Sequence, residues 1–420
     1  MPLFSLSVVV TAALVLLVGA GLVYLMLFRR APVTSVLPIT SLAVLPLENF
    51  SGNKDDEFLA DGITEELTTD LAKIGSLSVT SRTSVMQYKG AHKPLPEIVR
   101  ALHVDALVEG SVQRSGDRVK VTAQLIQGGT DKHLWAETYE RDMRDILALE
   151  SDLARTIARE IRAKVSDQEL TRMAGKQAVN PQAHEAYLRG VYSDDMDKSL
   201  AYYERANQLD PDYAPPYAAR ANIYHAFGMM GWRPPQEVAS NMRDGALTAL
   251  KKDDNLADGH ATLALTKLHY EWDFAGADQE FRRALELNPN SADNHHMYAH
   301  YLMAMDRGDE SVAESKRAVE LNPFDDYLTA CLGWHKLYAR QYDQARDQAL
   351  KALKMEPDHF WAHTVLAVRG NSPETCDLEN VSVVYTAWPW GRGRNGSGRK
   401  ICGWSVARWW AHRRMPFTIG

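Results

Sequence analysis

Cysteine is scarce in this chain, with three residues among 420. Cys331, Cys376 and Cys402 are too few and too scattered to predict a disulfide framework or a cysteine metal cluster. Catalytic signatures are also lacking: the sequence contains no GxxxxGK[ST] phosphate loop, no HExxH helix and no GxSxG turn. These absences predict a protein that is not an enzyme and that uses no cofactor and no metal.

Two weaker patterns do not change this prediction. Residues 391–396 (GRGRNG) have the glycine spacing of a dinucleotide fingerprint, but no helix and no acidic residue about 20 positions further on complete it. Glu65 and Glu66 form a carboxylate pair within a predicted helix. Adjacent helical residues point about 100° apart, so the pair cannot converge on one substrate atom, and a solvated helix face is expected.

Basic charge is lacking in the middle of the chain. The formal net charge is −7, and both ends carry an excess of basic residues, so the middle is strongly acidic. A nucleic-acid-binding surface needs a basic footprint. We therefore predict no nucleic acid as a partner.

Long hydrophobic runs are lacking after the first 30 residues. Residues 3–28 contain no charge and end at Arg29 and Arg30. About 20 apolar residues suffice to span a bilayer core of about 30 Å, so residues 1–30 are predicted to be a transmembrane anchor. A secretory signal peptide is the alternative, but a basic n-region and a convincing cleavage site are missing. Residues 31–40, with two prolines, are predicted to be a linker.

A repeat organises the second half of the chain. Ala284, Ala318 and Ala352 are 34 residues apart, and each is followed five residues later by a proline. This period is typical of the tetratricopeptide repeat (TPR), in which two helices are closed by a proline. We predict an all-α TPR solenoid over residues 181–370, with about four repeats and the first helix of another beginning at His359.

The register of the repeat predicts which residues pack and which line the inner groove. With the proline at position 32, small residues fall at the helix-crossing positions 8 and 20. Groove positions 2, 5, 9 and 12 of the first helices are predicted to bind a protein or peptide, although each of these residues could equally be core. They are Asn222, His225, Leu268, His296, His300, Met303, Tyr327 and Trp334.

The histidines of the groove allow two further interpretations. His296 and His300 are i, i+4 neighbours and could bind a metal, but no third ligand is apparent from the sequence. A histidine pKa near ~6.5 also allows a pH-responsive role. Ordinary surface or packing roles are favoured over both.

Residues 41–170 have the pattern of a small mixed α/β domain. Apolar residues at spacings of three and four predict helices over 59–74, 96–102 and 146–165. Alternating apolar residues on both sides of Ser115-Gly116-Asp117 predict a β-hairpin. The expected order is β-α-β-α-β-β-β-α, so the fold class is α+β, with a transmembrane helix first and a TPR solenoid last.

Residues 41–74 and 104–143 resemble the TolB-amino-terminal-like domain of bacterial signalling proteins. In those proteins this domain lies between a single transmembrane helix and a TPR array. The order of parts here is similar to the sensory half of membrane-integrated transcription regulators, membrane adenylate cyclases and receptor kinases. The resemblance implies an N-terminal cytoplasmic effector, which does not precede residue 3 in this sequence, and a periplasmic location for the rest.

The membrane orientation is predicted in two ways that disagree. Arg29 and Arg30 follow the apolar run, and the positive-inside rule alone would keep the remaining chain in the cytoplasm. The resemblance implies an inner-membrane, single-pass protein whose soluble part is periplasmic. We adopt the second prediction.

Residues 371–420 do not continue the repeat. They are rich in glycine, arginine and tryptophan and show no helical period. A shifted reading frame or a disordered basic tail explains such an ending.

The sequence thus predicts a membrane-anchored TPR protein that binds a protein, peptide or small signal molecule and relays or scaffolds it. Its partners would be a ligand in the TPR groove, the membrane through the N-terminal helix, and a second copy in a homodimer. The alternative is the truncated sensory half of a signalling enzyme or of a membrane-bound transcription regulator.

Overall fold

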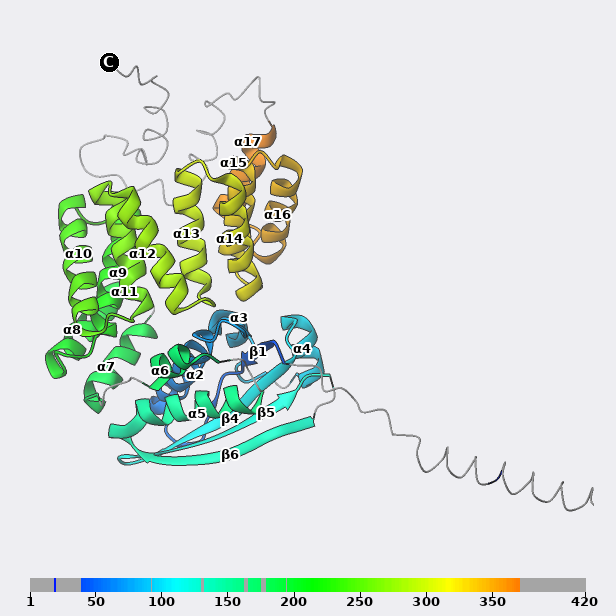
Figure 1. Cartoon of the computed structure of the whole chain (residues 1–420), viewed down its shortest axis with the longest axis vertical. Coiled ribbons are helices and arrows are strands. Elements are labelled where there is room, and N and C mark those ends of the chain that lie inside the picture. The colour runs from blue at the N-terminus through cyan, green and yellow to red at the C-terminus, as the bar shows by residue number, and fades with distance from the viewer. Residues whose placement is uncertain are drawn as a thin grey trace, which may run out of the picture.

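The computed structural model describes Gly19 and residues 39–370, apart from short gaps at 92, 130–131, 162–164, 175–178 and 194. Apart from Gly19, the predicted anchor lies outside the described residues, as do nearly all of the linker and the tail 371–420. Among the residues described, no helix is long and apolar enough to span a membrane. The described chain folds into an α/β domain below a stack of helix hairpins (Figure 1).

The α/β domain is built on a mixed sheet with the strand order β3-β1-β4-β5-β6, and β2 pairs with β4. The first strands are parallel, and β4, β5 and β6 are antiparallel. The bounds of the strands are β1 Ser41–Val44, β2 Glu48–Asn49, β3 Ser78–Val79, β4 Ala106–Ser115, β5 Arg118–Gln127 and β6 Lys132–Asp142.

The predicted β-hairpin is confirmed. Ser115 pairs with Arg118, so a two-residue turn joins β4 to β5, and Gly116 adopts φ 60° there. A hairpin turn of this length favours residues with positive φ, which glycine supplies without strain. Val119, Val121, Ala123 and Leu125 alternate into the core, as their spacing predicts.

Helices cover both faces of the sheet. α2 and α5 pack on one face with the main hydrophobic core, and α4 packs on the other with a smaller core. The α3 and α6 helices complete the domain. The bounds are α2 Glu57–Ala72, α3 Arg82–Met86, α4 Leu95–Leu102, α5 Ile146–Glu160 and α6 Asp167–Ala174, with 3-10 turns η1 Lys54–Asp56 and η2 Met143–Asp145.

Within the described residues the array contains five complete helix hairpins and α17, where the sequence predicts about four repeats. The difference lies in the second repeat, where Asp254 follows the end of α10 at the position that proline holds in the other repeats. The hairpins are α7 Pro181–Val191 with α8 Met196–Leu209, α9 Pro215–Met229 with α10 Pro235–Lys252, α11 Ala257–Thr266 and the π-turn η3 Lys267–Glu271 with α12 Phe274–Leu287, α13 Ala292–Ala304 with α14 Gly308–Leu321, and α15 Asp326–Tyr338 with α16 Tyr342–Met355, followed by α17 Phe360–Gly370.

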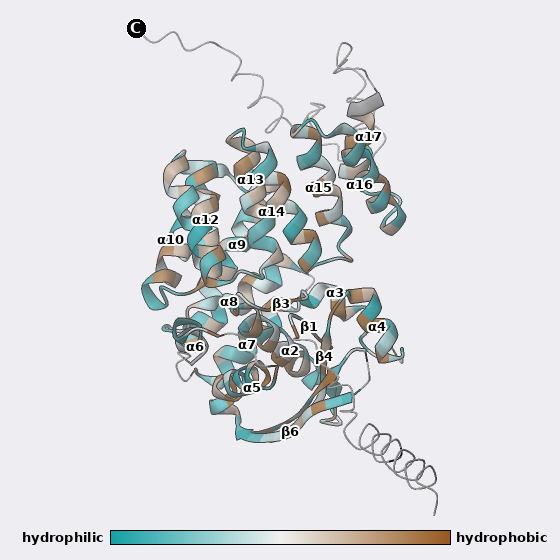
Figure 2. Ribbon diagram, turned by 45° about the vertical axis from the view of Figure 1, so that its right-hand side comes forward, coloured by the Kyte–Doolittle hydropathy of each residue, from teal (hydrophilic) through white to brown (hydrophobic). Residues whose placement is uncertain are grey.

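Small residues let the helices of each hairpin approach closely. Ala264, Ala277, Ala299 and Ala345 are buried at the predicted crossing positions, and so is Gly333. Hydrophobic and polar segments alternate along the helices of the array (Figure 2), as amphipathic packing requires. The structure therefore confirms the TPR-like solenoid and its register.

The array docks on the α/β domain through the loops between its repeats. The Asn290 side-chain amide lies 2.9, 3.2 and 2.8 Å from the carbonyl oxygens of Ala72, Ile74 and Leu77, at the C-terminal end of α2. One repeat later, the Ser81 backbone N–H donates to the Leu321 carbonyl at 2.8 Å. Tyr192 also donates from its hydroxyl to the Asp61 carbonyl at 2.8 Å. These hydrogen bonds hold the two parts in one orientation.

Candidate functional site

The first helices of the array line one surface, which we call the inner face and define by α9, α11 with η3, α13 and α15. These helices contact one another in succession along the array. One end of the inner face lies beside α2, because Glu65 of α2 interacts electrostatically with Asp258 of α11 and Asp293 of α13. The inner face is therefore shared between the array and the α/β domain.

The structure places the predicted groove residues at different depths. Asn222 is exposed, Tyr327 is 42% exposed, and Met303 and His300 are half-buried. Leu268 is 8% exposed and belongs to the core around Phe281, so it offers little surface to a partner. Trp334 packs against Trp361 and Tyr338. A binding role for each of these residues stays a prediction.

Histidines from successive repeats form a row along the inner face. The rings of His225 and His269 stack with their centroids 5.7 Å apart. Burial, reinforced by His269, lowers the pKa of His225 to about 4, and burial likewise lowers the pKa of His300 to about 4. These imidazoles are neutral at physiological pH, so titration near 6.5, one of the sequence-based alternatives, does not apply to them.

A tighter cluster lies between α13 and α15. The ring centroids of His296 and His300 are 4.5 Å apart, and those of His300 and His335 are 4.6 Å apart. His335 Nε2 lies 3.1 Å from His300 Nδ1. The thiol of buried Cys331 lies within 4.8 Å of ring nitrogens of His296 and His300. Tyr327 hydrogen-bonds to this thiol, and burial raises the thiol pKa to about 12.

The end of the inner face beside α2 is acidic. Burial raises the pKa of Glu65 to about 7, although Arg82, 3.4 Å away, opposes the shift. Burial raises the pKa of Asp293 to about 6, and the neighbouring Asp258 adds to this. Solvent reaches all three carboxylates, but they lie near one another where α2 meets α11 and α13, so ionisation costs more there than in open water.

The raised pKa of Glu65 makes a prediction for stability against pH. The folded chain binds the Glu65 proton more tightly than the unfolded chain between pH 4.5 and about 7. The contribution of Glu65 to the free energy of unfolding therefore falls as pH rises through that window. Glu65→Gln should remove the penalty, so its unfolding free energy relative to wild type should increase with pH from about 4.5 to 7 in urea titrations.

A matched control for that experiment is Glu57→Gln on the same helix. The hydrogen bond from Lys89 lowers the pKa of Glu57, so this carboxylate stabilises the fold at neutral pH and that contribution is lost as pH falls. Glu57→Gln should show the opposite trend. Parallel pH profiles for Glu65→Gln and wild type would contradict the placement of Glu65.

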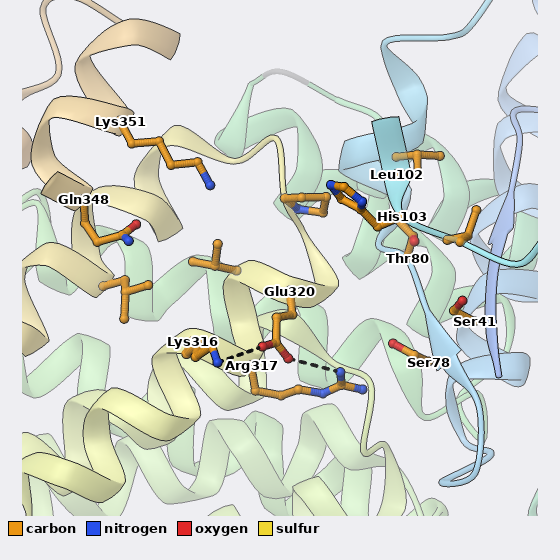
Figure 3. A pocket seen from close by; sticks show the side chains of 14 residues that line it. Ser41, Ser78, Thr80, Leu102, His103, Lys316, Arg317, Glu320, Gln348 and Lys351 are labelled. Atoms are coloured by element: carbon orange, nitrogen blue, oxygen red, sulfur yellow. Dashed lines mark ion pairs between the residues drawn. The ribbon is translucent and has the colours of Figure 1, made fainter. Parts of the chain in front are cut away.

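A separate cavity of about 440 Å³ lies between the sheet and the outer side of the array. Lys316 and Arg317 point to Glu320 within it, each 3.6 Å from a carboxylate oxygen (Figure 3). Lys351 projects toward the cavity from α16, and His103 lies at the end of α4. Because Glu320 offsets part of the positive charge, the cavity is a weaker anion site than its lysines suggest.

The order of strands and helices around this sheet can be compared with known families. Residues 35–133 match the TolB amino-terminal domain. The match ends within β6, and α5 lies beyond it. The resemblance noted in the sequence is therefore confirmed for this part of the chain.

One curated relative shares a longer stretch with this chain. It is named "Putative adenylate cyclase 3" of Rhizobium meliloti (strain 1021) and is 34% identical over 232 residues. The aligned stretch is 54% of this chain but 40% of that protein. The chain thus spans less than half the length of this relative.

Several solved TPR proteins have similar helix arrays. YrrB, described as a TPR protein with an unusual peptide-binding site, is 22% identical, with 44% of this chain and 89% of that chain covered and a TM-score of 0.32. A thermophilic TPR protein of Thermus thermophilus, TTC0263, is 16% identical, with 49% and 97% covered and a TM-score of 0.36.

Proposed function

We propose that this chain is a recognition protein that acts by binding and not by catalysis. In this proposal the inner face binds a peptide segment of a partner protein, and the α/β domain, which is docked on the array, transmits the binding signal. The observation that carries the proposal is the cluster of Glu65, Asp258 and Asp293, because it joins α2 to two repeats at one end of the inner face. A ligand that changes the charge there acts on both parts at once.

The chemistry of the inner face favours a partner with basic side chains. Carboxylates at one end would accept charge-assisted hydrogen bonds from lysine or arginine. Exposed Tyr327 and half-buried Met303 supply apolar contact surface farther along the same face. TPR grooves suit an extended segment or a partner helix with such anchors. The proposed ligand is therefore a peptide that combines cationic and apolar residues.

Selection of random peptides on the purified full chain tests this proposal. We expect the selected peptides to be enriched in lysine and arginine. For a labelled selected peptide, the Asp258→Asn/Asp293→Asn double variant should raise the Kd by about tenfold or more, since one lost hydrogen bond to a charged group costs about 1.5–3 kcal/mol. Fluorescence anisotropy measures this change.

The control is the Asp309→Asn/Asp347→Asn double variant. Both residues are exposed on α14 and α16, the outer helices of their hairpins, so the same loss of charge falls outside the inner face. This variant should bind the peptide like wild type. Equal effects of the two double variants, or none from the inner-face pair, would refute recognition at the inner face.

We further propose that residues 1–30 anchor the protein in the inner membrane with its soluble part in the periplasm, and that the α/β domain supports a homodimer. The support is the uncharged run 3–28 and the resemblance in domain order. Alkaline phosphatase fused after Lys176 should be active, whereas a cytoplasm-active fluorescent protein at that site should stay dark. The reverse pattern would reject the periplasmic assignment. Light scattering that gives a monomer mass would reject the dimer.

The second candidate function is the sensory half of a signalling enzyme, such as an adenylate cyclase or a kinase, or of a membrane-bound transcription regulator. The likeness to a relative that carries the name of an adenylate cyclase favours it. The two candidates share the binding step and differ in the output. In-frame codons for an effector domain upstream of Met1 would decide for this alternative, and a stop codon directly upstream would decide against it.

A further inference from the structure

We propose that His296, His300 and Cys331 form a binding site for a divalent transition metal ion of the zinc type on the inner face. Two ligands come from α13 and the third from α15, one repeat later. Their potential ligand atoms all lie within 4.8 Å of one another. Around a tetrahedral zinc ion, bonds of ~2.0–2.3 Å place neighbouring ligand atoms roughly 3.5 Å apart, so small side-chain rotations close the site.

His296 is the strongest single observation for this site. Its side chain is 1% exposed, and neither ring nitrogen has a hydrogen-bond partner. A buried polar group without a partner costs about 1–3 kcal/mol. A metal ion would satisfy one ring nitrogen at the point where His300 and Cys331 converge. Packing alone leaves both nitrogens unsatisfied.

Other histidines of the array show what a purely structural role looks like. His295, the next residue on the same helix, contacts Glu314 with Nδ1 at 2.5 Å and the Pro289 carbonyl with Nε2 at 3.0 Å. His260, at the corresponding place one repeat earlier, does the same with Glu280 and the Asp254 carbonyl. These histidines use both nitrogens within the protein, whereas His296 uses neither.

A second histidine supports the orientation of the ligands. His335 is 0% exposed, and its Nε2 lies 3.1 Å from Nδ1 of His300. When His300 Nδ1 donates the proton between these two nitrogens, its Nε2 is unprotonated and can bind a metal ion. Ligating histidines are commonly oriented through their second nitrogen in this way. His335 is thus a positioning residue for the site.

The donor set determines the class of metal. Two imidazoles and one thiolate suit zinc and related borderline ions, and they disfavour magnesium and calcium, which take oxygen ligands. On binding, Cys331 would release its thiol proton to water and bond through sulfur. An ion can approach from the side of half-buried His300 and exposed Tyr327. Three protein ligands leave a fourth position for water or a partner side chain.

Cobalt substitution of the purified full chain tests the site without any activity assay. After chelation and dialysis, wild type should bind Co²⁺ and show the near-ultraviolet thiolate-to-cobalt charge-transfer band, and Zn²⁺ should bleach it because zinc binds such sites more tightly. Cys331→Ser should lose the band although Cys376 and Cys402 remain. His296→Gln and His300→Gln should each weaken Co²⁺ binding by about tenfold or more, as expected for lost site interactions.

His295→Gln is the matched control, since it removes a neighbouring imidazole outside the site. It should retain the band and the wild-type affinity, and circular dichroism checks that each variant is folded. Should His296→Gln fail to fold, Cys331→Ser and His300→Gln carry the test. A wild-type protein without the band, or a band that survives Cys331→Ser, would overturn the proposal.

Discussion

Phe281→Ala should lower the free energy of unfolding by about 3–5 kcal/mol, the usual cost of truncating a fully buried phenylalanine. Phe281 is 0% exposed, and its ring lies 5.6 Å from that of Tyr298 and 5.8 Å from that of Tyr301 between centroids. These rings join α12 to α13, so the cavity would form at the junction of two repeats. Urea unfolding followed by circular dichroism measures the loss.

Phe50→Ala is the control for this prediction. Phe50 is 60% exposed, and truncation of an exposed side chain usually changes stability by no more than about 0.5 kcal/mol. A loss of unfolding free energy below about 1 kcal/mol for Phe281→Ala would mean that Phe281 does not pack tightly between α12 and α13. A large cost for both variants would point to an effect on the unfolded chain.

Asn290→Ala should destabilise the protein by about 1–3 kcal/mol, because it removes the hydrogen-bond donor to three buried carbonyl groups at the end of α2. The side chain is 5% exposed, and its oxygen also accepts from the Arg317 guanidinium at 2.9 Å. The substitution removes the bond between a repeat loop and the α/β domain. We expect the midpoint of urea unfolding to fall and the transition to broaden as the two parts separate.

Asn255→Ala is a closely matched control. Asn255 holds the corresponding place one repeat earlier, and its oxygen accepts from the Arg283 guanidinium at 3.2 Å, but it is exposed and has no hydrogen bond to the α/β domain among the described residues. The free energy of unfolding of this variant should stay within about 0.5 kcal/mol of the wild-type value. If both variants behave alike, the loop of Asn290 does not hold the domains together.

The features that repeat along the chain could be predicted from the sequence. The 34-residue period placed the helix pairs and the buried alanines, because close helix crossings require small residues at fixed positions. Alternation around Gly116 placed β4 and β5 for a similar local reason. The second repeat was harder to count, since Asp254 stands where proline is expected and an insertion over residues 228–235 interrupts the period.

The candidate site depends on contacts between distant segments, and these could not be predicted. Glu65 lies on a helix face that looks solvated in the sequence, but the array packs beside this face, and the partial burial raises the pKa of Glu65. Cys331 and His335 follow His296 by about one repeat, and only the stacking of α13 on α15 brings them together. A search for histidine and cysteine residues about one repeat apart would have predicted that α13 and α15 bring these side chains together.

The claim that the array and the α/β domain form one unit is tested most directly by hydrogen exchange at two adjacent amides. Thr80 N–H donates to the Leu42 carbonyl within the sheet at 2.9 Å, whereas Ser81 N–H donates across the interface to the Leu321 carbonyl at 2.8 Å. We predict that both amides are protected and open with similar free energies as denaturant is raised. Protection of Thr80 with free exchange of Ser81 would show that the two parts move independently, and it would contradict the proposed relay.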